Sequence, residues 1–355
     1  MTHAHVVAAG SLFLDIVSYG LKHAPVPGEE QWVEGGDIMA GGVANQAVAC
    51  ARLGLDVNVL TAFGSDRAGT WVRELLNDEN IRFDGSTTVE RQAVTIAQNF
   101  DGDRAFTTWG ENSAPLPPTD MPAPDYFLAS VPYIPAARET VRRWRAAGTT
   151  VIADSCWDPA KEWNPKNMEP IAEADIFVPN EVECLKYTKE DSCFKGASKF
   201  LEKVPTLIVT RGDKGVLIAE RAPGTTDASD PVYTELPAIS ARAIDTTGAG
   251  DSFTAGLVRG LVAGASLVEA AILGQVTAAW TVQRLGGSAA APTIAELLAW
   301  ADSGDLRWAA TAAGSPAPKD VQLNAPVAEV AAQSQNVTDA WDAPDPADVV
   351  RRLLG

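Results

Sequence analysis

The stretch Asp245–Phe253 reads Asp-Thr-Thr-Gly-Ala-Gly-Asp-Ser-Phe and leads directly into an apolar run with helical spacing. Small residues before a helix let backbone N–H groups converge on an anion, and the helix dipole adds to the attraction. Gly248, Ala249 and Gly250 are too small to keep an anion away from the backbone. Asp251 stands at the expected start of the helix, where its carboxylate can also face a nucleophile. The stretch therefore predicts a phosphate-binding site with a base beside it, which suits phosphoryl transfer.

A simpler interpretation of the same stretch is an ordinary glycine-rich helix entry with Asp251 as an acidic N-cap. A capping aspartate needs only itself, so this interpretation leaves the preceding Asp245-Thr246-Thr247 without a purpose. We therefore favour the phosphate-binding interpretation.

Short β-branched runs and helical patterns alternate along most of the chain, which is typical of βαβ units around a mostly parallel sheet. Two segments, from about residue 17 to 39 and from about 92 to 108, interrupt the alternation and resemble exposed strands and hairpins. We interpret them as a small β-sheet lid over the carboxyl edge of the sheet, although an edge extension of the main sheet would give nearly the same pattern. The expected strands are Val6–Gly10, Val57–Thr61, Tyr126–Ser130, Thr150–Ala153, Ile176–Val178 and Thr206–Thr210, and the expected helices include Ala44–Leu53, Thr70–Leu76, Ala136–Ala147 and Ala197–Glu202.

Composition and charge exclude several classes of protein. With 355 residues, of which 46% are hydrophobic and 21% charged, the chain is expected to bury a sizeable core. Its formal net charge of −18 repels nucleic acid and anionic membranes. No apolar run reaches the length of about 18 residues that a membrane span needs, and no basic segment precedes the first apolar stretch. We therefore expect a soluble, cytoplasmic protein that binds neither nucleic acid nor membrane.

Other catalytic motifs are missing from the sequence. All three histidines lie within the first 23 residues, and no HExxH, GxSxG or GxxxxGK[ST] occurs. Triad hydrolases, zinc proteases and P-loop enzymes are therefore disfavoured. From about residue 310, Ala, Pro, Asp and Gln dominate. We expect residues 1–309 to form the main domain and 310–355 to form an Ala/Pro/Asp-rich extension with one short helix over Asp345–Leu354.

A second glycine-rich segment precedes the helix expected over Ala44–Leu53. Gly41 and Gly42 permit a ligand to approach the backbone closely, and Asn45 offers both a donor and an acceptor to hydroxyl groups. A helix-entry turn would explain these glycines equally well. Asp15 follows the first buried strand closely, and a charged residue in that place is more often functional than structural.

Asn180 and Glu183 follow a buried strand, at the carboxyl edge where open α/β sheets bind ligands. Their spacing also fits a helix N-cap with a capping-box glutamate, which requires no ligand. Both interpretations remain open from the residues alone.

The segment Thr210–Gly215 joins two strands, and a tight turn between them would need only its glycines. Arg211 and Lys214 add two cations in a strongly acidic protein, which is consistent with a triphosphate nearby.

The segment DTTGAGDSFTAGLV resembles the C-terminal signature of the ribokinase (PfkB) family of carbohydrate kinases and matches it at every constrained position. The resemblance covers about Val6 to Trp300 and includes three more motifs in the family's order, which are the segments described above around Asn45, Asn180 and Gly212. In the first of these, Val43 stands where a small residue is usual. It implies an α/β fold with a Rossmann-like, mostly parallel central sheet flanked by helices and a small β-sheet lid. It also implies an ATP-dependent kinase that transfers the γ-phosphate to a hydroxyl of a small sugar, and a homodimer formed through the lid.

The resemblance also implies roles for individual residues. Asp251 would take the proton from the substrate hydroxyl, and the backbone of Gly248, Ala249, Gly250 and Asp251 would form an anion hole. The substrate would be bound by Asp15, Gly41, Gly42, Asn45 and Asp251. ATP would be bound by Asn180, Thr210, Gly212, Gly215 and Gln275. Glu183 would hold Mg²⁺ through water, and a monovalent cation such as K⁺ would be held by Asp245, Thr247 and Gly286.

Departures from the family pattern bear on the substrate. Phe13 stands where ribokinases usually have Asn, and a glutamate usual near Ser130 is missing, so ribose is disfavoured. A ketohexose, a deoxy sugar acid or a nucleoside remains open. One alternative is a nucleoside kinase, in which Phe13 and Trp109 stack on a base. Another is a non-catalytic sugar-binding protein, against which the intact Asp251 motif counts.

Overall fold

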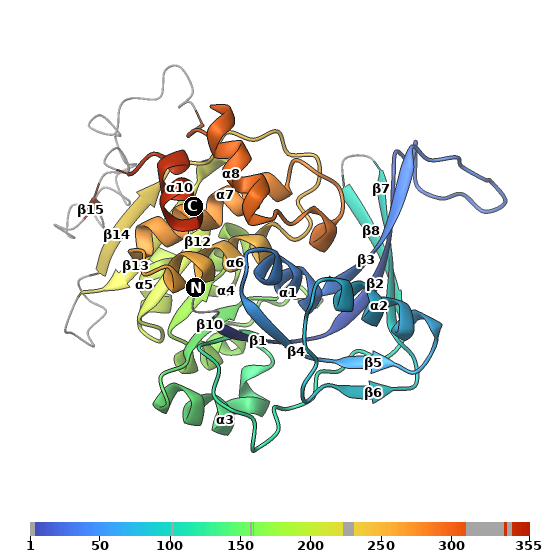
Figure 1. Cartoon of the computed structure of the whole chain (residues 1–355), viewed down its shortest axis with the longest axis horizontal. Coiled ribbons are helices and arrows are strands. Elements are labelled where there is room, and N and C mark those ends of the chain that lie inside the picture. The colour runs from blue at the N-terminus through green and yellow to red at the C-terminus, as the bar shows by residue number, and fades with distance from the viewer. Residues whose placement is uncertain are drawn as a thin grey trace.

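The computed structural model describes residues 4–100, 103–156, 158, 160–222, 231–309, 337–338 and 343–355. A nine-stranded sheet lies between two layers of helices, and a smaller sheet stands to one side (Figure 1). The strands of the large sheet, in spatial order, are β15 (Val337–Thr338), β14 (Pro231–Leu236), β13 (Val216–Arg221), β12 (Thr206–Thr210), β11 (Ile176–Val178), β10 (Thr150–Asp154), β9 (Tyr126–Ser130), β1 (His5–Ala9) and β4 (Asp56–Leu60).

All neighbouring strands from β4 to β12 pair in parallel, whereas β12, β13 and β14 pair antiparallel. The predicted α/β fold with a mostly parallel sheet is confirmed. Successive residues of each strand point to opposite faces, so a strand buried on both sides must be apolar throughout. In β1, Val6 and Ala8 enter one hydrophobic core while Val7 and Ala9 enter the other.

Helices cover both faces of the sheet. One core receives side chains from α1 (Val43–Arg52), α6 (Ala249–Val262), α7 (Leu267–Thr281), α8 (Ile294–Ser303) and α10 (Pro346–Leu354). The other receives them from α3 (Ile134–Ala146), α4 (Glu181–Thr188), α5 (Cys193–Leu201) and the 3₁₀ helix η1 (Pro165–Glu173). Apart from the strands of the smaller sheet, the other elements are α2 (Arg67–Asp78), the strands β5 (Ala62–Gly64) and β6 (Thr87–Val89), and the 3₁₀ turns η2 (Gly212–Lys214) and η3 (Gly287–Ala290).

The smaller sheet is the predicted lid, and its strand order is β3-β2-β7-β8. Because it is a separate sheet, the alternative of an edge extension is wrong. Its first strand follows β1 after a short turn, so the lid rises from the carboxyl edge of the large sheet (Figure 1). The four strands are β2 (Leu12–Tyr19), β3 (Gly35–Gly42), β7 (Ala93–Phe100) and β8 (Asp103–Trp109).

The bounds of the first lid segment differ from the prediction of about 17 to 39. Strand β2 begins earlier, at Leu12, and strand β3 ends later, at Gly42. Residues 20–34 between the two strands form a long loop. The glycines of β3 concealed this strand, because glycine is depleted in strands and has no side chain to show alternation. The predicted hairpin is present as the antiparallel pair of β7 and β8, and its turn at 101–102 lies outside the described residues.

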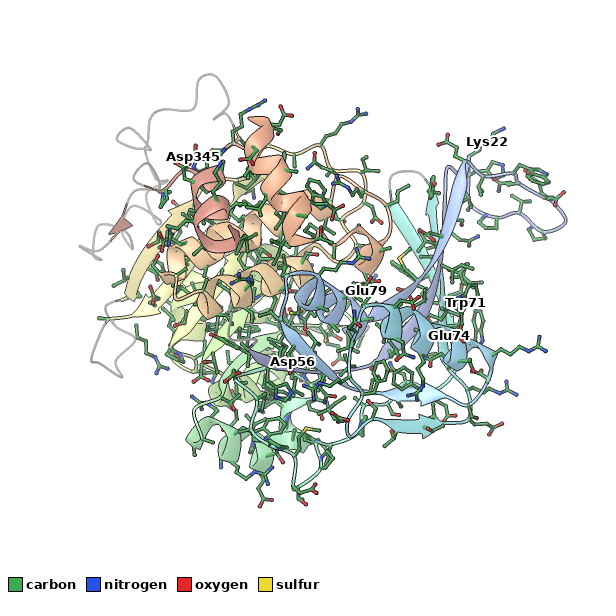
Figure 2. All side chains as sticks on the ribbon, viewed as in Figure 1. Lys22, Asp56, Trp71, Glu74, Glu79 and Asp345 are labelled. Carbon is green, nitrogen blue, oxygen red and sulfur yellow. The ribbon has the colours of Figure 1, made fainter. Side chains whose placement is uncertain are left out.

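The predicted terminal helix is present as α10, and the Asp345 side chain caps its first turn (Figure 2). Val349, Val350, Leu353 and Leu354 of this helix are buried in the core beside α7 and α8. Most of the predicted extension, at 310–336 and 339–342, lies outside the described residues. In the described part of the chain, no helix combines the length and apolar character of a membrane span.

Candidate active site

Helix α6 starts within the glycine-rich signature, at Ala249, with Gly248 as N-cap. The prediction that it starts at Asp251 is wrong by two residues, because Gly248 adopts a φ of 73° and the small residues after it join the first turn. The position that a Cβ atom on Gly250 would occupy has no neighbour within 4 Å, so this turn is open to a ligand. The space beside Gly250 lets an anion approach the N-terminus of α6, although the N–H of Ala249 itself donates to Thr246 O at 3.3 Å.

Asp251 lies in the first turn of α6 and accepts a hydrogen bond from the side chain of Asn45 at the start of α1. Burial raises the pKa of Asp251 to about 7, and the hydrogen bond from Asn45 opposes this effect. The other side-chain atom of Asn45, Oδ1, is buried without a hydrogen bond to any described group. The site thus combines a carboxylate that can take up a proton near neutral pH with an unsatisfied acceptor for a hydroxyl group.

Asp15 lies on lid strand β2, opposite Met39 of β3 and Thr95 of β7. Burial raises the pKa of its carboxyl group to about 6, and a hydrogen bond from Thr95 lowers it. A Cβ atom on Gly41 would lie 1.8 Å from Asp15 Oδ2, so only glycine leaves room for this carboxylate. A Cβ atom on Gly42 would lie 2.2 Å from Ser11 O and 2.7 Å from the Phe13 ring, and its φ of 64° also favours glycine.

A third carboxylate, Asp154 at the end of β10, belongs to the site and was missed from the sequence. Burial raises its pKa well above the usual range, and the negative charges of Asp251 and Glu183 add to this effect. Gln46 donates to Asp154 Oδ2 at 3.3 Å, so neighbouring amides at the start of α1 hold two carboxylates, Asp154 and Asp251. The sequence pattern could have indicated this residue, since Asp154 ends a buried strand at the carboxyl edge of the sheet, where α/β proteins bind ligands.

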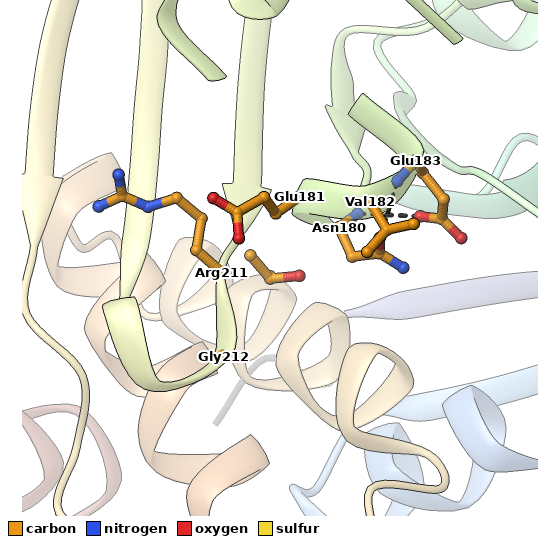
Figure 3. Close-up of a pocket in the computed structure, with 7 residues that line it drawn as sticks. Asn180, Glu181, Val182, Glu183, Arg211 and Gly212 are labelled. Atoms are coloured by element: carbon orange, nitrogen blue, oxygen red, sulfur yellow. Dashed lines mark hydrogen bonds between the residues drawn. The ribbon is translucent and has the colours of Figure 1, made fainter. Parts of the chain in front are cut away.

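Three of the five predicted ATP-binding residues, Asn180, Thr210 and Gly212, line a pocket of about 290 Å³ between α4 and the turn after β12 (Figure 3). The Glu183 carboxylate accepts hydrogen bonds from Ser155 Oγ at 2.5 Å and Asn180 N at 2.9 Å, and Asn180 Oδ1 accepts from Glu183 N. These contacts form the predicted capping box. Both residues also line the pocket, so the helix-capping and ligand-binding interpretations are compatible. The residues that line the pocket are Asn180, Glu181, Val182, Glu183, Thr210, Arg211 and Gly212.

Gly215 closes the turn beyond the pocket, and a Cβ atom on it would lie 2.0 Å from Leu236 O. Next to this contact, Gln275 Nε2 donates to Pro237 O at 2.8 Å, and its Oε1 is buried without a hydrogen bond from any described group. Gln275 is therefore close to the turn but does not line the pocket.

The two cations expected to serve a triphosphate are held by acidic side chains instead. Arg211 pairs with Glu235 at 2.7 Å, and Lys214 pairs with Glu181 at 2.8 Å. Figure 3 shows Arg211 pointing away from Glu183. These pairs lower the positive charge at the pocket, which sequence alone could not reveal because the partners are distant in the chain.

The three residues of the candidate cation site lie in direct contact. Asp245 Oδ1 accepts hydrogen bonds from Thr247 N at 2.9 Å and Thr247 Oγ1 at 2.7 Å, while Oδ2 accepts from Gly286 N at 3.2 Å. The Gly286-Gly287 turn also packs against the site, because a Cβ atom on Gly287 would lie 3.0 Å from Asn45 Oδ1. Asp245 thus joins the signature loop to a second loop beside Asn45.

Trp109, expected to stack on a ligand, lies on the other face of the lid from Asp15. It pairs directly with Val94, whereas Asp15 shares its face with Thr95 and the facing Thr108. Phe106 precedes Thr108 by two residues on the same strand, so it lies on the Asp15 face, and it is 60% exposed. Sequence alone could not fix this register, which exchanges the two faces when it shifts by one residue.

Comparison with known proteins agrees with this geometry. A model of the pfkB family carbohydrate kinases matches residues 3–294. The ribokinase of Lactococcus lactis is 28% identical over 313 residues, which cover 84% of this chain and 97% of that protein.

Solved structures give the same result. The Thermotoga maritima ribokinase superposes with a TM-score of 0.67 at 27% identity, over 84% of this chain and 99% of that chain. The Arabidopsis thaliana ribokinase, solved with ribose and ATP, superposes with a TM-score of 0.65 at 25% identity, over 82% of this chain and 96% of that chain.

Proposed function

Since the chain belongs to the pfkB family of carbohydrate kinases, we propose that it transfers the γ-phosphate of ATP to a hydroxyl group of a small sugar or sugar-like acceptor. The observation that carries the proposal is Asp251, which stands at the open N-terminus of α6 and is held by Asn45. A base and an anion site in one helix turn are what in-line transfer to an alcohol needs.

In this proposal, Asp251 takes the proton from the acceptor hydroxyl as the phosphoryl group leaves ATP. The backbone N–H groups of Gly248, Ala249, Gly250 and Asp251 stabilise the charge on the transferring group. Asp15, Gly41, Gly42 and Asn45 bind the acceptor between lid and body. The buried, unsatisfied Oδ1 of Asn45 supports this assignment, because an acceptor hydroxyl would satisfy it.

ATP would bind in the pocket beside α4, with its phosphates directed toward α6. Asn180, Thr210 and Gly212 line this pocket, and Gly215 shapes its turn. Gln275 would contact the adenine through its buried Oε1, which has no hydrogen bond to a described group.

Among the described residues, no three His, Cys, Asp or Glu side chains form a metal site by themselves, so Mg²⁺ would be held jointly by ATP and the acidic groups beside it. The carboxylates of Asp154, Asp251 and Glu183 interact unfavourably, and the chain's own nearby cations are paired elsewhere. Glu183, through water, and Asp154 would hold the ion. When bound, Mg²⁺ supplies positive charge that offsets the ATP phosphates and these carboxylates.

A monovalent cation such as K⁺ would be held by carbonyl and side-chain oxygens of the loops that contain Asp245, Thr247 and Gly286. The contacts between these loops support the proposal, since they place the two chain segments side by side. Assays in KCl and in a tetramethylammonium salt would test it, because only K⁺ should stimulate turnover.

We further propose a cytoplasmic protein that forms a homodimer through the lid, and the exposed side chains on β8 are consistent with the dimer. Phe106 and Trp109 are 60% and 48% exposed on opposite faces of this edge strand. Sedimentation of the purified chain would show a species of twice the 37.4 kDa chain mass if the lid dimerises.

A nucleoside acceptor is the second candidate, and the lid favours it specifically. Phe13 and Phe106 are aromatic side chains on the lid face that also carries Asp15, so either could stack on a base. A non-catalytic sugar-binding protein is the third alternative.

The experiment that separates these functions supplies ATP and Mg²⁺ with neutral sugars and nucleosides, and measures ADP release and product mass. We expect acceptor-dependent ADP release with a sugar. Phosphorylation of nucleosides but no sugar would select the second candidate, and binding without ADP release would select the third.

The pH dependence should report Asp251 and Asp15. Both must be ionised to act, so kcat/KM for the acceptor should rise with pH through about 6 and about 7. Thr95→Val removes the hydrogen bond that lowers the pKa of Asp15, and should move that limb to higher pH. A pH–rate profile of both proteins tests this, and coincident profiles would contradict it.

Because the pKa values of Asp15 and Asp251 are higher in the folded than in the unfolded state, the stability contributed by these groups falls as pH rises from about 4 to about 7.

Glu183→Gln should raise the Mg²⁺ concentration needed for half-maximal activity about 10- to 100-fold, as for residues that orient bound metal. Glu296→Gln is the matched control, since Glu296 forms the same capping box on α8. A Mg²⁺ titration at fixed ATP measures the effect. Equal shifts in both variants would assign Glu183 to helix capping alone.

A further inference from the structure

The elements around the acceptor side of the site contain carboxylates and almost no cations. Strands β2, β3, β7, β9 and β10 contain no lysine or arginine, and neither do segments 245–251 and 285–291. On α1, the only cationic residue is Arg52 in the last turn, and it pairs with Glu79 and two carbonyl oxygens of η3 and the residue after it. Arg284, which immediately precedes the second segment, stacks on Trp280 and donates to its carbonyl oxygen. These strands and segments therefore offer a ligand no cationic side chain of their own.

The carboxylates of this region have no cationic partner among the described residues. Burial raises the pKa of Asp15 and of Asp251, hydrogen bonds from Thr95 and Asn45 oppose this, and no cation lowers the pKa of either group. Asp154 is influenced by charge, but only from Asp251 and Glu183. An anionic group entering this region would meet the ionised carboxylate of Asp15, and that of Asp251 once it has lost its proton, in a partly buried setting where screening is weak.

Two cationic residues of the lid lie toward its far end. Lys22 stands where the long lid loop begins, away from the large sheet (Figure 2). Arg104 is on β8 four residues from Thr108, about 13 Å along the strand, and its side chain lies outside the described residues. The backbone of both residues is thus at the end of the lid away from Asp15.

Building on the proposed kinase function, we propose that the acceptor site selects uncharged polyhydroxy compounds and rejects sugar phosphates and sugar acids. The only anion that the site accommodates is then the nucleotide triphosphate, which arrives with Mg²⁺. The deoxy sugar acids left open by the sequence are excluded, and neutral sugars and nucleosides remain.

The test compares matched acceptors that differ in charge and keep a primary hydroxyl: fructose with its 1-phosphate and 6-phosphate, and glucose with gluconate. Neutral nucleosides complete the panel. We expect kcat/KM for a neutral acceptor to exceed that of its anionic counterpart by about 100-fold or more. A higher kcat/KM for any anionic member, or equal values within a pair, would overturn the inference.

A designed change of charge gives an independent test. Thr108 faces Thr95, with Oγ1 atoms 3.1 Å apart, on the same lid face as Asp15. Thr108→Lys should raise kcat/KM for the anionic acceptors at least 10-fold, and Thr108→Met, which loses the same hydrogen bond without adding charge, should not. Equal effects of the two variants would contradict the electrostatic explanation.

Failure of the kinase function itself can be distinguished. If no compound is phosphorylated, the kinase proposal fails, and the charge preference is then read from thermal stabilisation of the full chain by the same compounds. Greater stabilisation by the neutral members supports the inference. Stabilisation by the anionic members, or equal shifts for both sets, overturns it.

Discussion

Replacing Asp251 with Asn should reduce kcat about 10³-fold while leaving acceptor and ATP affinity nearly unchanged. A positioned general base contributes about 10²- to 10⁴-fold. The asparagine keeps the size of the side chain and can still pair with Asn45, but cannot accept the proton. Single-turnover and steady-state kinetics on the purified variant measure the loss, and calorimetry measures the retained binding.

The matched control is Asp348→Asn, which changes another first-turn aspartate, on α10 far along the chain. It should leave kcat at the wild-type value. The folded Asp251 variant should also be at least as stable as wild type above pH 7, because it no longer buries an ionised carboxylate. Activity within tenfold of wild type would refute the assignment of Asp251 as the base.

The sequence predicted the fold because local patterns and the global topology agree. Val6–Ala9 and the other parallel strands are apolar throughout, which is the pattern of strands buried on both faces. The signature around Asp251 likewise predicted a helix entrance open to a ligand. Lid strand β3 was placed less well because its glycines carry no periodicity.

Features that depend on pairing between distant segments could not be predicted. The partners of Arg211 and Lys214 come from β14 and α4, so no local pattern indicated that both cations are paired. The face occupied by Trp109 depends on the register of β7 and β8. Asp154 differs from these cases, since the end of a buried strand marked it as clearly as Asp15.

The role of the chain's end is also invisible in its composition. Residues after 309 read as an extension, and we still propose 1–309 as the kinase domain that carries the site. The helix α10 nevertheless contributes to the same hydrophobic core as α6 and α7. Stability of that domain should therefore depend on a segment outside it.

Truncation of the chain before residue 343 should abolish stable folding or lower the unfolding temperature by about 10 °C or more, because a loss of several kcal/mol shifts this temperature by that order of magnitude. Val349, Val350, Leu353 and Leu354 are almost fully buried. Burial of each stabilises the fold by about 1.5–3 kcal/mol, so the helix contributes roughly 6–12 kcal/mol as an upper estimate. This is comparable with the whole stability of a typical domain, about 5–15 kcal/mol.

A single substitution gives the same test without changing chain length. Leu353→Ala leaves a cavity beside α8 and should cost about 2–5 kcal/mol, whereas Asp348→Ala, on the exposed side of the same helix, should cost less than about 1 kcal/mol. Urea unfolding of the wild type, the two variants and the truncated chain measures these differences in the free energy of unfolding. If Leu353→Ala and the truncated chain unfold at the wild-type urea concentration, α10 is a separate appendage, and the boundary at 309 is also the boundary of the folding unit.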